Sequence, residues 1–224
     1  MFDRLALLIG KNKLNLIKYK KILVLGLGGV GGYVVETLIR SGISDIILVD
    51  FDKIDITNLN RQIISNLNNL ENLKTDEWEK RILSINKDVK ITKINCFIDE
   101  DNYKDLFNLD IDYFIDCCDT INTKKLIIEE CLYKKIKFIS SMGMGNKFDA
   151  NKIEITDIRN TKNDKIAKIL RKWVKDNNIN DKILVCSSTE VPKDIKGTVI
   201  GSTAFVPSTA GLIIASHIIN DIIK

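Results

Sequence analysis

The sequence predicts an α/β fold: a Rossmann-like, doubly wound and mainly parallel sheet with a carboxy-terminal α/β elaboration. Apolar runs of strand length alternate with helical patterns, a glycine turn joins the first strand to a helix, and no linker or composition break divides the 224 residues. Uniformly apolar strands are typical of parallel sheets covered on both faces. We therefore expect one domain over 1–224, with its core at about 1–145 and the elaboration at about 146–224.

The first half of the chain supplies a strand–helix–strand unit. Residues 5–19 have helical spacing interrupted by Gly10, which predicts a helix or a broken pair of helices. The unit itself consists of a strand at 21–25, a glycine turn at 26–31, a helix ending at Gly42 and a strand at 46–49. Beyond it we expect a polar loop at 50–62, helices at 74–85 and 100–107, and strands at 89–94 and 113–115.

The second half continues the alternation with a looser pattern. The expected helices are 126–133, an amphipathic 164–177 and a final 210–223, and the expected strands are 138–139, a half-exposed 153–155 and 183–185. The apolar stretch Gly201–Ile219 contains too many polar residues for a membrane span. It therefore predicts a buried helix in a soluble, cytoplasmic protein with no membrane partner.

Composition excludes several classes of protein. A hydrophobic fraction of 45% and a net charge of only +4 argue against disorder, and two prolines argue against collagen-like material. Of the 34 basic residues 28 are lysine, as in proteins from AT-rich genomes, so a lysine run is weak evidence for nucleic-acid binding. The five cysteines form no Cys-x-x-Cys pair, which predicts reduced thiols and no structural zinc.

The glycine turn is the first feature that indicates function. Gly26, Gly28 and Gly31 form a G-x-G-x-x-G pattern between a strand and a helix, where backbone and helix dipole favour a phosphate. Asp50, at the end of the second strand, is placed to bind a ribose hydroxyl. On spacing alone, a nicotinamide or flavin enzyme is the leading interpretation.

The residues after Asp50 favour a triphosphate instead. Asn58, Arg61 and Lys74 supply more cationic and polar groups than a dinucleotide pyrophosphate needs. Asp119, at the carboxyl end of another strand, is placed to hold Mg²⁺ at the same edge of the sheet. The candidate nucleotide-binding residues are Gly26, Gly28, Gly29, Gly31, Asp50, Asp52, Asn58, Arg61, Lys74 and Asp119.

These motifs resemble the ATP-binding core of the ubiquitin-activating-type adenylyltransferases, the group of MoeB, ThiF and HesA. The resemblance rests on 26–31, 50–52, 57–62, Lys74 and 116–119. It implies that Asp50 binds ribose, Arg61 and Lys74 bind phosphates, and Asp119 holds Mg²⁺. It also implies a homodimer in which Arg4 reaches the ATP of the other subunit, although Arg4 is also interpretable as a frayed terminal residue.

The later segments resemble the tRNA threonylcarbamoyladenosine dehydratase branch. Family members that load sulfur-carrier proteins usually hold zinc in two Cys-x-x-Cys pairs, which this chain lacks. The segments that fit the dehydratases are 141–149, 153–158, 170–173, 186–190 and 207–211. This resemblance implies ATP-dependent activation of the threonylcarbamoyl carboxylate on the tRNA adenosine next to the anticodon, followed by cyclisation. A cysteine desulfurase or sulfur-acceptor protein is a further implied partner.

Two alternatives to the dehydratase remain. An adenylyltransferase for the Gly-Gly terminus of a small ubiquitin-like sulfur carrier would use the same ATP residues. A non-catalytic or redox Rossmann protein would need only the glycine turn and Asp50.

Further candidate residues lie outside the nucleotide motifs. The basic side chains of the 164–177 helix, among them Lys168, Arg171 and Lys172, suit either a solvated face or tRNA backbone contact. Cys186 is either a reactive thiol or a small buried hydrophobe. Lys124 is a further candidate, whereas the single histidine, His217, is expected to be structural.

Overall fold

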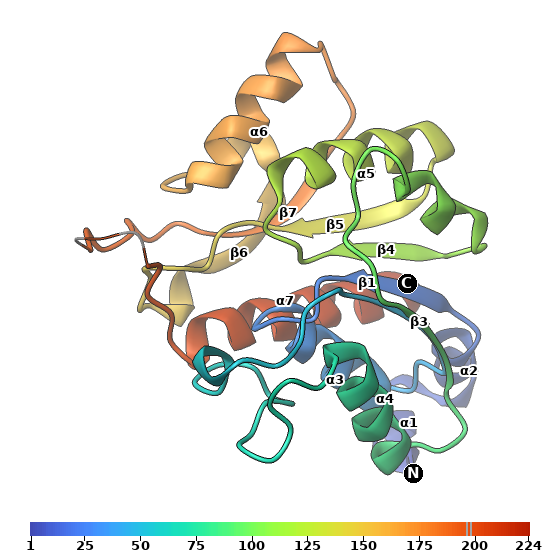
Figure 1. Cartoon of the computed structure of the whole chain (residues 1–224). Helices are drawn as coiled ribbons and strands as arrows, with labels where there is room; N and C mark the ends of the chain where they lie inside the picture. Colours follow the sequence, from blue (N-terminus) through green and yellow to red (C-terminus); the bar gives the residue numbers. More distant parts are fainter. Residues whose placement is uncertain (196, 198) are drawn as a thin grey trace.

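The computed structural model describes residues 1–195, 197 and 199–224 (Figure 1). Within these residues a seven-stranded sheet has the strand order β3-β2-β1-β4-β5-β7-β6. Neighbouring strands are parallel except β6, which is antiparallel to β7. The strands are β1 (Lys21–Leu25), β2 (Asp45–Val49), β3 (Lys90–Ile94), β4 (Tyr113–Asp116), β5 (Lys137–Ser141), β6 (Ile153–Asp157) and β7 (Leu184–Ser188). The predicted doubly wound, mainly parallel fold is confirmed.

Helices cover both faces of this sheet. In Figure 1, α5 and α6 lie above the sheet and α3, α4 and α7 lie below it. The helices are α1 (Asp3–Ile9), α2 (Lys11–Lys18), α3 (Gly31–Arg40), α4 (Lys74–Ile85), α5 (Ile121–Lys134), α6 (Lys165–Asp176) and α7 (Phe205–Ile222). Short 3-10 turns occur at Ile56–Asn58 (η1), Tyr103–Asn108 (η2), Ala150–Lys152 (η3) and Ile158–Asn160 (η4).

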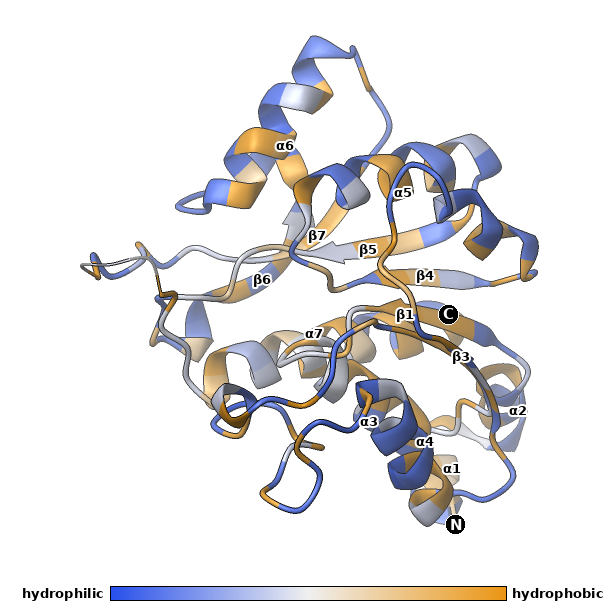
Figure 2. Ribbon diagram, viewed as in Figure 1, coloured by the Kyte–Doolittle hydropathy of each residue, from blue (hydrophilic) through white to orange (hydrophobic). Residues whose placement is uncertain are grey.

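The central strands are apolar throughout because both of their faces are buried. Ile22 and Val24 of β1 pack into the core cluster that also contains buried residues of α3 and α7. Leu23 and Leu25 of the same strand pack on the other side, with Phe114 of β4. Figure 2 shows this apolar colouring along the strands. Alternate side chains point to opposite faces of a strand, so two cores require a continuous apolar run.

Helix α5 begins five residues before the predicted start at 126. Its first turn carries polar side chains that are nevertheless buried: the Thr123 hydroxyl donates to the carbonyl of Ile98 (2.7 Å), and Lys124 pairs with Asp116. Such residues do not contribute to a hydrophobic period, so the pattern of apolar residues misses this turn.

Helix α7 also begins earlier than predicted, at Phe205 rather than 210. Pro207 lies in its first turn, where the missing N–H of proline costs no intrahelical hydrogen bond. The segment predicted as a helix at 100–107 is instead the 3-10 turn η2. At the amino terminus, Gly10 has φ +84° and separates α1 from α2, so the broken pair is the form present.

The carboxy-terminal elaboration extends the same sheet. Strand β7 pairs with β5 and β6 pairs with β7, while α7 returns to pack on α3. A Cβ on Gly211 of α7 would lie 2.5 Å from the carbonyl oxygen of Val30, so only glycine permits this approach. Among the described helices, α7 is the one long and apolar enough to cross a membrane, with a mean hydropathy of 1.2. Here its buried residues lie in the core with α3.

Candidate nucleotide-binding site

The glycine turn lies at the carboxyl end of β1. In the sheet β1 stands between β2 and β4, so the chain builds the sheet outward in one direction up to β3 and in the other direction from β4 on. Gly26 has φ +84°, and a Cβ there would lie 2.8 Å from the backbone of Cys117. A Cβ on Gly31 would fall onto the carbonyl oxygen of Gly26. These two glycines therefore let the turn close against the β4 loop. The turn leads into the amino terminus of α3, whose first N–H groups favour an anion.

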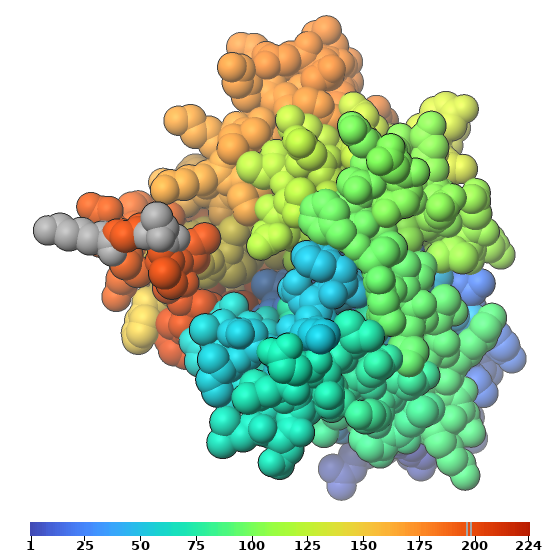
Figure 3. Space-filling view, viewed as in Figure 1, coloured from blue at the N-terminus to red at the C-terminus, as the bar shows by residue number. Residues whose placement is uncertain are grey.

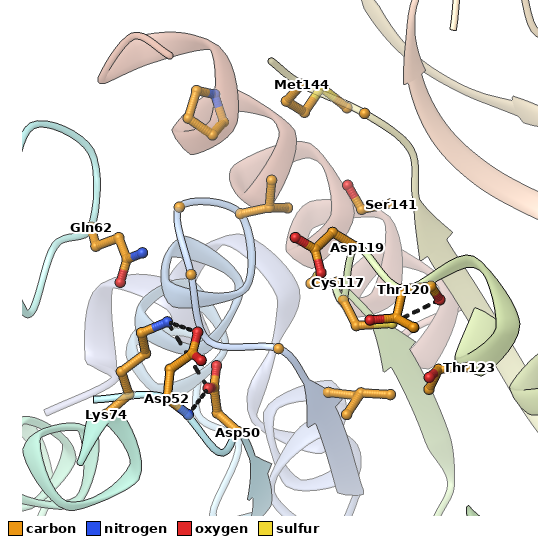
Figure 4. A pocket seen from close by; sticks show the side chains of 18 of the residues that line it. Asp50, Asp52, Gln62, Lys74, Cys117, Asp119, Thr120, Thr123, Ser141 and Met144 are labelled. Atoms are coloured by element: carbon orange, nitrogen blue, oxygen red, sulfur yellow. Dashed lines mark hydrogen bonds and ion pairs between the residues drawn. The ribbon is translucent and has the colours of Figure 1, made fainter. Parts of the chain in front are cut away.

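Asp50 at the end of β2 is held close to this turn. One carboxylate oxygen accepts from the N–H of Leu27 (2.6 Å) and the other from the N–H of Asp52 (2.8 Å). The Lys74 ammonium lies 2.6 Å from the Asp52 carboxylate and 4.0 Å from that of Asp50 (Figure 4). Burial raises the pKa of Asp50, against the lowering effects of Lys74 and the two N–H groups. Lys74 is thus the cation that offsets two carboxylates at the cavity floor.

The segment after β2 contributes the second group of polar side chains. Asn58 and Asp55 cap η1 reciprocally, which fixes the turn. The Arg61 guanidinium donates to the carbonyl of Thr57 (2.7 Å) and to the Asn60 side chain (3.0 Å), and the Arg61 side chain lines the cavity. Gln62 is 6% exposed and also lines the cavity, and its side-chain oxygen has no hydrogen-bond partner among the described residues. An unpaired buried amide oxygen in a cavity indicates a position for a ligand donor.

Asp119 extends into the same cavity from the loop after β4, across the glycine turn from Lys74 (Figure 4). The base of this loop is a fully buried network. Lys124 donates to Asp116 (2.9 Å), to the Ser140 hydroxyl (3.2 Å) and to the carbonyl of Ser141 (2.8 Å), and Asp116 also accepts from the N–H of Cys118 (3.1 Å). Burial opposes the charged form of Lys124, but the charge of Asp116 and neighbouring groups outweigh it and raise the pKa.

These elements enclose a cavity of about 430 Å³. Of the ten predicted nucleotide-binding residues, nine line it, and Gly31 lies just beneath the turn. Several lining residues were not predicted from the sequence: Phe51, Gln62, Phe97, Thr120, Thr123, Ser141, Met142, Met144 and Ile166. The rings of Phe51 and Phe97 meet edge to face at 5.1 Å. Phe51 and Phe97 come two and three residues after the carboxyl ends of β2 and β3, which is the signal that would have located them.

The structure does not bring Arg4 to this cavity. Arg4 is exposed on α1, and the lining residues do not include it. A role for Arg4 in the site of its own chain is therefore excluded by position, which leaves the two interpretations of a terminal residue and of a group acting on a second copy.

Contacts within the protein account for three of the further candidates from the sequence. Cys186 is fully buried in β7, its thiol lies near the carbonyl of Ala210, and burial raises its pKa to about 12, so it is not a reactive thiol. Arg171 donates to the carbonyl (2.9 Å) and hydroxyl of Thr161, so it anchors the start of α6 instead of facing a ligand. Lys124 is fully buried and belongs to the Asp116 network.

The remaining basic candidates of α6 are available to solvent. Lys168 and Lys172 are exposed, and the helix buries Ala167, Leu170 and Val174 against α5 and β7. Ile169 of the same helix is 44% exposed. In Figure 3 the helix projects from the body of the molecule.

Known proteins resemble the chain over its whole length. Residues 2–224 match the model of the ThiF family. The tRNA threonylcarbamoyladenosine dehydratase of Bacillus subtilis is 39% identical, over 100% of this chain and 94% of that protein. Crystal structures of the E. coli tRNA N6-threonylcarbamoyladenosine dehydratase in complex with AMP and with ATP superimpose with a TM-score of 0.93. They are 31% identical to this chain, and each match covers 99% of this chain and 93% of that one.

Another branch matches a smaller part of the chain. The molybdopterin-synthase adenylyltransferase of Haemophilus influenzae is 29% identical over 55% of this chain and 51% of that protein. One cavity is lined by the glycine turn, by Asp50 and Lys74, and by Asp119, all of which belong to the motifs on which the resemblance rests. The family match spans all of these residues. The chain belongs to the ThiF family.

Proposed function

We propose that this chain is an ATP-dependent tRNA threonylcarbamoyladenosine dehydratase, which activates the threonylcarbamoyl carboxylate on tRNA and promotes its cyclisation. The observation that carries the proposal is the extent of the match. The B. subtilis dehydratase matches 100% of this chain, including the elaboration after residue 145, whereas the molybdopterin-synthase adenylyltransferase matches 55%. The elaboration is where the two functions would differ, because the ATP residues are shared.

The chemistry suits the residues of the cavity. A carboxylate is already a nucleophile, so its activation by ATP needs no general base, and the enzyme acts in this step by neutralising phosphate charge and aligning the attack. One carboxylate oxygen bonds to the α- or the γ-phosphorus of ATP, and pyrophosphate or ADP, respectively, leaves as the P–O bond breaks. The oxygen or a nitrogen of the carbamoyl group then attacks the activated carbonyl carbon, a carbamoyl N–H gives up its proton, and AMP or inorganic phosphate leaves with the former carboxylate oxygen. The net change in the nucleoside is the loss of one water.

We assign the nucleotide contacts by position. Asp50 binds the ribose, the glycine turn and the amino terminus of α3 receive phosphates, and Arg61 and Lys74 neutralise them. For Lys74 this requires exchanging its contact with Asp52 for a phosphate. Gln62 adds a free amide at the cavity wall.

Asp119 is the residue we assign to Mg²⁺. No group of three or more acidic, histidine or cysteine side chains with metal-site geometry occurs in the described part of the chain. The single carboxylate of Asp119 fits Mg²⁺, because this ion is commonly held by one or two carboxylates together with substrate phosphates. When bound, the ion would neutralise charge on the phosphates.

A homodimer completes this proposal. Helix α1 buries none of its residues, and Leu7 and Leu8 are 86% and 83% exposed. A seven-residue helix is not stable by itself, so an apolar surface of this kind indicates a covering partner. We propose that a second copy covers it and that Arg4 reaches the ATP of that copy.

The tRNA is the substrate, and we assign Lys168 and Lys172 on α6 to its backbone. Both are exposed, and Ile166 at the start of the same helix lines the cavity. A cysteine desulfurase or sulfur-acceptor partner receives no support from the site, because the pKa values of all five thiols are raised by burial. We place the enzyme in the cytoplasm, where its two substrates occur.

The test offers the purified chain ATP, Mg²⁺ and tRNA that carries threonylcarbamoyladenosine. We expect a nucleoside lighter by one water, formed together with AMP and pyrophosphate or with ADP, whichever phosphorus is attacked. The Asp119→Asn variant is expected to lose turnover. Nucleotide hydrolysis only with a Gly-Gly carrier protein would support the adenylyltransferase instead. Turnover with neither substrate, combined with tight NAD binding, would support a redox or non-catalytic Rossmann protein.

A further inference from the structure

A second pair of aromatic side chains lies within three residues along the chain of the cavity-lining Gly145 and Pro207. Phe148 and Phe205 meet edge to face with ring centroids 5.0 Å apart, and they are 58% and 42% exposed. Phe148 follows β5, and Phe205 begins α7 two residues before Pro207, which lines the cavity. The Phe51–Phe97 pair follows β2 and β3 instead. Since β1 and β4 separate these strands, the two pairs flank the cavity from opposite sides.

The backbone around Phe148 is fixed by hydrogen bonds. The N–H groups of Phe148 and Asp149 both donate to the Glu190 carboxylate, at 2.8–3.0 Å. The N–H of Asn146 donates to the carbonyl of Gly201 (2.7 Å), and the side-chain oxygen of Asn146 accepts from the N–H of Gly201 (2.6 Å). The carbonyl of Asn146 accepts from the backbone N–H of Lys193 (2.7 Å). The exposed ring thus stands on a preorganised loop that follows β5 and is bonded to Glu190, Lys193 and Gly201.

A cation accompanies the exposed ring. The Lys193 ammonium lies 4.6 Å from the ring centroid of Phe148. An exposed aromatic ring with a lysine over it combines a stacking surface with a phosphate-attracting charge. This combination is typical of sites for single-stranded nucleic acid, where unpaired bases stack on aromatics and the backbone is neutralised nearby.

We propose that Phe148, Phe205 and Lys193 form a stacking platform for an unpaired nucleobase of the tRNA loop, next to the adenosine that enters the cavity. The inference rests on the proposed function, because it takes tRNA as the substrate. A base to be modified must leave its stack to enter an enclosed site, and its neighbour then loses a stacking partner. The platform replaces that partner immediately outside the mouth, with Lys193 available to the adjoining phosphate.

The experiment measures binding of a short anticodon stem-loop RNA and of ATP separately, by fluorescence anisotropy and calorimetry. For Phe148→Ala we expect RNA affinity to fall about tenfold, within the range for one stacked base, with ATP affinity unchanged. Phe148→Trp is expected to restore binding, whereas Phe148→Leu, which is apolar but cannot stack, is not. Tyr133→Ala is the matched control and should leave RNA affinity unchanged. Tyr133 is 83% exposed and lies at the end of α5, near the amino end of β5 and therefore away from the carboxyl ends of the strands.

RNAs with one abasic position beside the target adenosine locate the stacked base. On the RNA that lacks the stacked base, Phe148→Ala should cause no further loss of RNA affinity, because the stacking contact between ring and base is already absent. Equal RNA affinity of the wild-type chain and Phe148→Ala would overturn the platform and leave the proposed function intact. A wild-type chain that binds no RNA would overturn both. A change in sedimentation on Phe148→Ala with unaltered RNA binding would make the aromatics a contact between copies, and would also overturn the proposal.

Discussion

The Asp116–Lys124 pair is the residue-scale feature on which the site depends most. Both side chains are fully buried, and their bonds connect the end of β4, the start of α5 and the end of β5. Asp116 also holds the N–H of Cys118, one residue before Asp119. The pair therefore sets the position of the loop that presents Asp119, although neither residue faces the cavity.

We predict that Lys124→Met destabilises the chain by about 3–5 kcal/mol, because an uncompensated carboxylate stays buried. Denaturant unfolding at fixed protein concentration measures this. The double variant Asp116→Leu/Lys124→Met should regain most of the stability, since an apolar pair replaces a buried ion pair without large cost. Its ATP turnover should nevertheless stay low, because nothing then holds the Cys118 N–H. Full turnover in the double variant would contradict a positioning role.

At the scale of single elements, helix α1 has no residue buried within one copy of the chain. Its exposed Leu7 and Leu8 contribute nothing to the described core. We predict that Leu7→Asp/Leu8→Asp gives a folded monomer without turnover, as measured by sedimentation, circular dichroism and the dehydration assay. Tyr133→Asp, at an equally exposed position on α5, should remain dimeric and active.

Arg4→Ala is expected to stay dimeric and to lose turnover. Mixing Arg4→Ala subunits with Lys74→Ala subunits should restore activity, because half of the sites in a mixed dimer then contain both groups. Restoration would fail if Arg4 served its own subunit or had only a structural role.

The elements also show what a sequence pattern can predict. Strands β1, β2 and β4 and helix α3 were located almost to the residue, because apolar runs and a glycine turn mark them directly. The first turn of α5 was missed because Thr123 and Lys124 are buried through polar partners. The ten nucleotide-binding candidates could be predicted because their spacing follows strand ends, and nine of them line one cavity. The burial of Cys186 and the anchoring role of Arg171 depend on contacts with Ala210 and Thr161, which no local pattern reveals.

At the scale of the whole molecule, the chain is proposed to be one domain. The elaboration shares the sheet through the β5–β7 pairing, and its last helix packs on α3. The chain contains two tryptophans that report on different regions: Trp78 is fully buried in α4, and Trp173 lies in α6 on the other face of the sheet.

We predict that a destabilising substitution in the elaboration also lowers the free energy of unfolding that Trp78 fluorescence reports. Leu170 is fully buried in α6, and Leu170→Ala should lower the free energy of unfolding by about 2–5 kcal/mol through the lost contacts and the cavity. In a Trp173→Phe background, urea unfolding followed by Trp78 fluorescence should shift to lower urea, and should coincide with the circular dichroism transition. If the Trp78 midpoint stayed in place while circular dichroism showed a second transition at lower urea, the chain would consist of two independently unfolding units with a boundary near residue 145. Coincident transitions would mean that the α6 surface and the nucleotide site belong to one cooperative unit, as expected for a single domain.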